Sequence, residues 1–162
     1  DQDGPHRVAL CLMEALVDHE VSFAVEPPHP DVVEAILRRT GSRPAPAEDA
    51  AYVLCEGPSL VRVLARACTG DAEYPDRGAT VFCLVDGLWD GPPETAAVVI
   101  GLAGPGIAGK RHLAVAGLPA AALGAFAACN AQPPQGVDLV LFTPRGEIAC
   151  LGRYTRLELE GS

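Results

Sequence analysis

Hydrophobic positions along the chain follow two periods, one typical of helices and one typical of strands. In residues 5–17 apolar side chains recur at i, i+4, i+7 and i+8, which places them on one face of a helix. These side chains are Val8, Leu12, Ala15 and Leu16. The same period predicts further helices at residues 31–41, 59–67 and 118–130. Short apolar or alternating segments predict strands at residues 21–25, 50–56, 79–85, 95–103, 110–116, 137–142, 147–151 and 153–160.

Helices that alternate with apolar strands are typical of α/β folds, in which helices cover a central sheet. Residues 79–85 (ATVFCLV) form a nearly continuous apolar segment, of the kind that is covered on both faces. The segment Thr143–Gly146 separates two strands and predicts a β-hairpin, which makes the central sheet mixed. Residues 69–78 and 86–93 are expected to be loops. No repeat or boundary divides the pattern, so we expect one domain over residues 1–162.

Composition and charge exclude several classes of protein. The chain has 162 residues, of which 49% are hydrophobic, which is too apolar for a disordered protein. Its net charge of −9 argues against a nucleic-acid-binding surface and against an anionic membrane surface, because both need clustered basic side chains. No apolar stretch approaches 18 residues, and the start of the chain does not resemble a signal peptide. We therefore expect a cytoplasmic protein.

The segment that follows the strand at 95–103 matches the G-x-G-x-x-G pattern of dinucleotide-binding loops. It reads Gly-Pro-Gly-Ile-Ala-Gly over residues 104–109. The context differs from that of a dinucleotide site, because a strand rather than a helix follows and residues 124–130 contain no acidic residue for a ribose. A turn between two strands is therefore the favoured interpretation. The alternative is a contact with an anion or an acidic partner through Gly104, Gly106, Lys110 and Arg111.

The residues that usually support catalysis are scattered. Lys110 is the only lysine in the chain, so it is the only side chain that could form a Schiff base. The six cysteines include no C-x-x-C pair, and the four histidines form no H-x-x-x-H motif. His29 and the pair His19–Glu20 flank one short strand and could meet; Asp138 is expected to be a buried or capping carboxylate. We expect no catalytic residue, no cofactor and no metal site.

A series of motifs in the C-terminal half resembles the PhnH family of phosphonate-metabolism proteins. In order, the motifs are Leu102–Ile107 (LAGPGI), Arg111, Gly117–Pro119 (GLP), Pro134–Leu141 (PQGVDLVL) and Arg153–Thr155 (RYT). Residues 10–25 also resemble the family's helix, acidic turn and strand. The likeness covers about residues 8–159. Two features depart from the family's pattern. Its N-terminal helix and turn have no counterpart before Val8, and its P-R-T-T motif is replaced by Gly152–Thr155 (GRYT).

The resemblance implies both a fold and a role. The family has a three-layer α/β/α fold like that of pyridoxal-phosphate-dependent transferases, without a functional cofactor site. Its members are subunits of the bacterial carbon–phosphorus lyase core complex (alpha-D-ribose 1-methylphosphonate 5-triphosphate synthase), which acts in organophosphonate catabolism. They pair as homodimers or with a sister subunit, and catalysis is attributed to other subunits. We therefore expect a non-catalytic structural subunit. Two alternatives stay open: a stand-alone protein or enzyme that binds an anion or nucleotide at residues 104–111, and a stand-alone self-associating protein.

Overall fold

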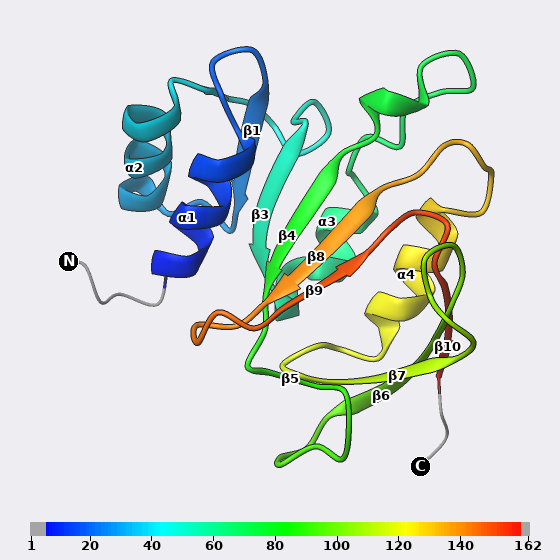
Figure 1. Cartoon of the computed structure of the whole chain (residues 1–162). Coiled ribbons are helices and arrows are strands. Elements are labelled where there is room, and N and C mark those ends of the chain that lie inside the picture. The colour runs from blue at the N-terminus through cyan, green and yellow to red at the C-terminus, as the bar shows by residue number, and fades with distance from the viewer. Residues whose placement is uncertain (1–5, 160–162) are drawn as a thin grey trace.

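Helices and strands alternate along most of the chain, and the strands form two sheets (Figure 1). The computed structural model describes residues 6–159. The helices are α1 (Arg7–Leu16), α2 (Pro30–Thr40), α3 (Leu60–Leu64) and α4 (Ala121–Cys129). The strands are β1 (Ser22–Glu26), β2 (Arg43–Pro44), β3 (Tyr52–Glu56), β4 (Thr80–Leu84), β5 (Gly87–Trp89), β6 (Val98–Ala103), β7 (Arg111–Ala116), β8 (Asp138–Phe142), β9 (Ile148–Leu151) and β10 (Arg156–Leu159). Within residues 6–159, no helix combines the length and the hydropathy that a membrane crossing requires.

The main sheet has six strands in the order β2-β1-β3-β4-β8-β9. The first five are parallel, and β9 returns antiparallel to β8 through the hairpin at residues 143–147. In β4, at the centre of the sheet, Val81 lies opposite Val53 of β3 and Leu139 of β8. Both faces of these central strands are buried, which explains why their sequences are continuously apolar rather than alternating.

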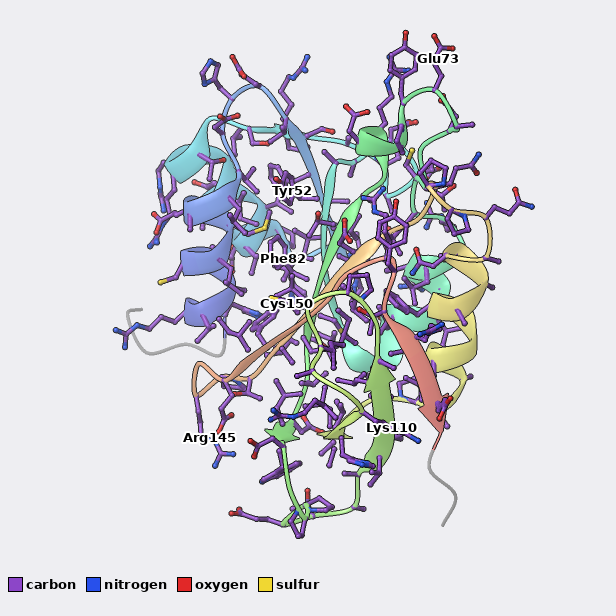
Figure 2. The ribbon with its side chains drawn as sticks, turned by 45° about the vertical axis from the view of Figure 1, so that its right-hand side comes forward. Tyr52, Glu73, Phe82, Lys110, Arg145 and Cys150 are labelled. Carbon is purple, nitrogen blue, oxygen red and sulfur yellow. The ribbon has the colours of Figure 1, made fainter. Side chains whose placement is uncertain are left out.

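Helices pack on both faces of the main sheet. Because successive strand residues point to opposite faces, Phe82 lies on the side of α1 and α2, whereas Val81 lies on the side of α3 and α4. On the α1–α2 side, Met13 of α1 and Ile36 of α2 are fully buried in one apolar cluster with Phe82. Figure 2 shows Tyr52 and Phe82 between α1 and the sheet, and their rings stack with centroids 6.0 Å apart.

The second sheet is antiparallel, with the strand order β10-β6-β7-β5. Several of its buried side chains, among them Ile100 and Val115, belong to the same apolar cluster as those of α3 and α4. Gly57, which follows β3 of the main sheet, meets Gly117, which follows β7 of the second sheet. A Cβ atom on Gly57 would lie 1.9 Å from the carbonyl oxygen of Gly117. Glycine at position 57 is therefore required by this close backbone contact.

The structure confirms a mixed α/β protein and a sheet that contains both parallel and antiparallel pairs. Two expectations were wrong. Residues 86–93 are not entirely loop, because β5 pairs with β7, and the strands do not all join one central sheet. A three-residue strand is too short to show a period, and a local pattern does not tell which strand a segment will pair with. The expected helix start at residue 5 and strand end at residue 160 lie outside the described residues.

Candidate functional site

Residues 104–110 form a turn between the antiparallel strands β6 and β7, and Arg111 is the first residue of β7. Gly104 has a φ of 146°, and a Cβ atom there would lie 2.9 Å from the carbonyl oxygen of Tyr154. Gly106 also has a positive φ, of 79°, with open space around it. These backbone requirements explain the glycines without a nucleotide, as expected for a turn between strands.

The basic residues of this turn lie at the surface, as Figure 2 shows for Lys110. The Lys110 ammonium lies 2.8 Å from the Glu158 carboxylate of β10. Arg111 is exposed and lies opposite Leu102 in β6. The carboxylate of Glu158 offsets the charge of Lys110, so the turn attracts an anion less strongly than its sequence indicates. A contact of this turn with an anion or partner stays a prediction.

Asp138, at the start of β8, is only partly buried and caps no helix, but its carboxylate binds Arg153. Its carboxylate accepts a hydrogen bond from the backbone N–H of Arg153, at 2.8 Å, and also pairs with the guanidinium of that residue. His29, by contrast, does not meet His19 and Glu20. Those two residues precede β1 and His29 follows it, so the five-residue strand separates them.

A pocket that sequence reasoning missed lies at the carboxyl ends of the parallel strands. It has a volume of about 300 Å³, part of it open to solvent. Strands β1, β3, β4 and β8 end at this pocket, and α1 and α2 begin beside it. Its apolar surface is formed by Ala9, Val25, Val32, Leu54, Leu84 and Phe142.

Polar and ionisable side chains also line this pocket, which we call the strand-end pocket. The rings of His6 and His29 are 5.5 Å apart, centroid to centroid, and tilted by 47°. Glu26 lies 3.3 Å from Arg62 and 3.5 Å from Arg66 of the α3 region, so its charge is balanced. Glu56 is the last residue of β3 and is half-buried. The sequence provides only a weak indication of this pocket, because its residues lie at strand ends and helix starts and do not form a recognisable motif.

Two cysteines at the centre of the main sheet are expected to be unreactive. Cys55 of β3 and Cys83 of β4 are buried and lie opposite each other in register. The hydrogen bond with Cys83, together with burial, raises the pKa of the Cys55 thiol. Burial also raises the pKa of Cys129. A thiol with a raised pKa is a poor nucleophile because the thiolate is the reactive form. Among residues 6–159, no group of three or more His, Cys, Asp or Glu side chains is placed to hold a metal ion.

Comparison with known proteins gives one consistent family. The family model described as bacterial phosphonate metabolism protein (PhnH) matches residues 2–158. The chain is 34% identical over 160 residues to a putative C-P lyase subunit protein, HtxG, of Stutzerimonas stutzeri; the match covers 99% of this chain and 76% of that protein. It is 44% identical over 91 residues to the alpha-D-ribose 1-methylphosphonate 5-triphosphate synthase subunit PhnH of Rhizobium meliloti (strain 1021). That second match covers 56% of this chain and 42% of the relative.

Proposed function

The chain belongs to the PhnH family of bacterial phosphonate metabolism proteins, and on this basis we propose that it is a structural subunit of a carbon–phosphorus lyase complex. In this role it contributes contact surfaces in the cytoplasm to a complex that acts on organophosphonates, while other subunits make and break the bonds. The observation that carries the proposal is the family match, which extends over almost the whole chain rather than over one motif.

The residues that carry the family resemblance support a scaffold role. Gly104 lets the turn after β6 approach Tyr154. Gly117 has a φ of 80° and lies against Asp86, where a Cβ atom would be 2.6 Å from the Asp86 carboxylate. Asp138 and Arg153 tie two segments together. These positions hold loops in place, and none of them lines the strand-end pocket.

The outer edge of the main sheet supports self-association and contact with other subunits. In the described part of the chain, β9 pairs only with β8, so its other edge is open for hydrogen bonds. Ile148 is 50% exposed on this strand, and Cys150 is exposed as well. We include a homodimer in the proposal, together with the three-layer arrangement and the likeness to pyridoxal-phosphate-dependent transferases that the family implies.

Complementation and co-purification test the proposed role together. The host is a bacterium that obtains its phosphorus through a carbon–phosphorus lyase and from which its own PhnH-family gene has been deleted. It receives this chain together with the other lyase subunits of the organism from which this chain comes. We expect growth on methylphosphonate, and we expect the tagged chain to retain the other subunits through purification. Failure of both contradicts the proposal. Ile148→Lys is expected to weaken retention, whereas Leu37→Lys, at an exposed apolar position on α2, serves as the matched control.

The turn at 104–111 is a second candidate contact. Gly106 and Gly109 leave open space beside the exposed Arg111, which gives an acidic group access to the backbone and the guanidinium. Calorimetric titration of the isolated chain with nucleotides and alkylphosphonates tests it. If this turn binds an anion, the heat should disappear in the double variant Lys110→Ser with Arg111→Ser, whereas a structural subunit alone should give little heat. Heat that survives this double change would show that the anion binds elsewhere.

A further inference from the structure

We propose that the strand-end pocket binds a small zwitterion, whose acid group meets His6 and His29 and whose ammonium group meets Glu56. This inference concerns the chain by itself and does not depend on the proposed subunit role. Nothing in the family match or in the relatives' names assigns a ligand to this pocket.

The topology of the main sheet places the pocket where α/β proteins generally bind small ligands. From β1 the chain passes through α2 to β2, which is the neighbour of β1 toward one edge of the sheet. From β3 it passes through α3 to β4, which is the neighbour of β3 toward the other edge. Accordingly, α2 and α3 pack on opposite faces. The strand order therefore reverses between β1 and β3, and open α/β sheets bind ligands outside the carboxyl ends of their strands at such a point. Residues 25–27 and 54–56, which end these two strands, line the pocket.

The apolar surface of the pocket fits a small carbon skeleton. Leu54 of β3, Leu84 of β4 and Phe142 of β8 come from three neighbouring strands and provide a continuous hydrophobic surface. Leu54 and Phe142 are buried, and both belong to the apolar cluster under α1 and α2. The volume of about 300 Å³ includes open solvent, so only a small, short molecule fits against this surface.

The side of the pocket formed by the two helices favours an acid group. His6 and His29 stand at the starts of α1 and α2, and their neighbouring rings can donate N–H hydrogen bonds into the same space. Neither N-cap side chain, His6 or His29, bonds to the first amides of its helix, and α2 begins with Pro30, which has no N–H. The amides that follow and the positive ends of the helix dipoles add to the attraction. Asp31 lies in the first turn of α2 but does not line the pocket. In Figure 1 both helices begin at the end of the sheet where β3 and β4 finish.

The two glutamates on the pocket differ in what balances their charge. Arg62 and Arg66 already balance Glu26. Among the described residues, no cation lies within ion-pair distance of Glu56, although the residue is half-buried. An anion alone would be repelled by this carboxylate, and an amine alone would leave the histidine side unused. A molecule with an acid group and an ammonium group on one short chain can bind the histidines and Glu56 at the same time.

A set of matched probes tests the proposal on the purified full chain. Calorimetric titration compares 4-aminobutanoate with butanoate and butylamine, which share its carbon number but carry one charge each. We expect 4-aminobutanoate to bind at least ten-fold more tightly than either. A parallel titration with 3-aminopropylphosphonate distinguishes a phosphonate head group from a carboxylate. Tighter binding of either zwitterion supports the proposal. Equal binding of butanoate or butylamine, or no heat with both zwitterions at millimolar concentration, overturns it.

Two variants assign the ends of the ligand. Glu56→Gln is expected to reduce zwitterion affinity about ten-fold and to leave butanoate unaffected or more tightly bound, because it removes the repulsion. His29→Ala is expected to weaken both the zwitterion and butanoate. The matched controls are Glu34→Gln, on the exposed side of α2, and His19→Ala, at the opposite end of β1. Unchanged affinity in both pocket variants, with melting temperatures equal to that of the parent chain, places the ligand elsewhere and contradicts the proposal.

Discussion

Arg153 and Asp138 form an ion pair that joins the end of β9 to the start of β8. Two guanidinium nitrogens of Arg153 lie 3.3 and 2.7 Å from one Asp138 carboxylate oxygen, and the backbone N–H of Arg153 donates to the other oxygen at 2.8 Å. The remaining guanidinium nitrogen donates to the Pro75 carbonyl at 2.6 Å. The Arg153 side chain is only 14% exposed. One side chain therefore connects three segments that lie far apart in the sequence.

Replacement of Arg153 by alanine is expected to destabilise the chain. It removes two charge-assisted contacts and leaves the Asp138 carboxylate and the Pro75 carbonyl without this donor, at a cost of about 2–3 kcal/mol in the free energy of unfolding. Arg153→Lys is expected to cost less, because an ammonium can keep one of the two contacts but not both. Urea denaturation measures both variants. Equal stability of the alanine variant and the parent chain would contradict the structural role assigned here.

Val137→Asp is expected to be among the most damaging single changes. Val137 is fully buried immediately before β8, and its backbone N–H donates to the Asn130 side chain at 2.9 Å. An unpaired carboxylate there would lose its hydration, at a cost of more than about 4 kcal/mol. The control is Gln132→Asp, an exposed position in the preceding loop. Thermal melting distinguishes them: the control should melt with the parent chain, and a similar result for Val137→Asp would rule out the burial described here.

Two glycine-to-alanine changes should act in opposite directions. At Gly57 the added methyl group would meet the Gly117 backbone at 1.9 Å, so the two sheets must separate; we expect a loss of about 2–3 kcal/mol. At Gly124, on the exposed side of α4, the methyl group meets nothing within 4 Å and helix propensity gains about 0.5–1 kcal/mol. Chemical denaturation measures both changes. A stabilised Gly57→Ala variant would refute the close contact between the sheets.

Cysteine labelling should follow burial and pKa. Cys11 and Cys150 are exposed, so a maleimide should modify them first in the native protein. Cys55 and Cys83 are buried, and the raised pKa of Cys55 further lowers its thiolate fraction at neutral pH. The raised pKa of Cys129 should likewise delay its reaction relative to Cys150. Mass spectrometry of timed samples gives the order. Modification of Cys55 or Cys83 before unfolding would contradict the packing of the main sheet.

The proposed homodimer predicts the mass in solution. A single chain has a mass of 16.8 kDa, and light scattering of the purified protein is expected to give twice that mass. If the β9 edge forms the contact, Ile148→Lys should shift the mass toward that of a monomer, because it places a charge at a half-exposed apolar position. Figure 2 shows Arg145 at the tip of the adjacent hairpin, and Arg145→Ser provides a control away from the strand. A monomeric parent chain removes the dimer from the proposal.

Local pattern was sufficient for most elements. The apolar period of residues 8–16 corresponds to α1, and the segment 79–85 corresponds to β4 at the centre of the main sheet. The turn after β6 was also correctly predicted as a connection between two strands, because the strand that follows it is visible in the sequence. These features depend on neighbours within a few positions. The strand-end pocket does not: His6 and Glu56 are 50 positions apart and share no motif, so only the fold brings them together.

The sequence by itself determined most of the elements, the class of fold and the family, because periodicity and ordered motifs are properties of the chain before it folds. Tertiary structure alone decided how the ten strands of residues 6–159 divide into two sheets, which glycines allow those sheets to touch, and which ionisable groups face one pocket. The physical reason is that strand pairing and side-chain proximity are long-range. Each strand exposes the same backbone donors and acceptors, and packing of the whole core selects its partner.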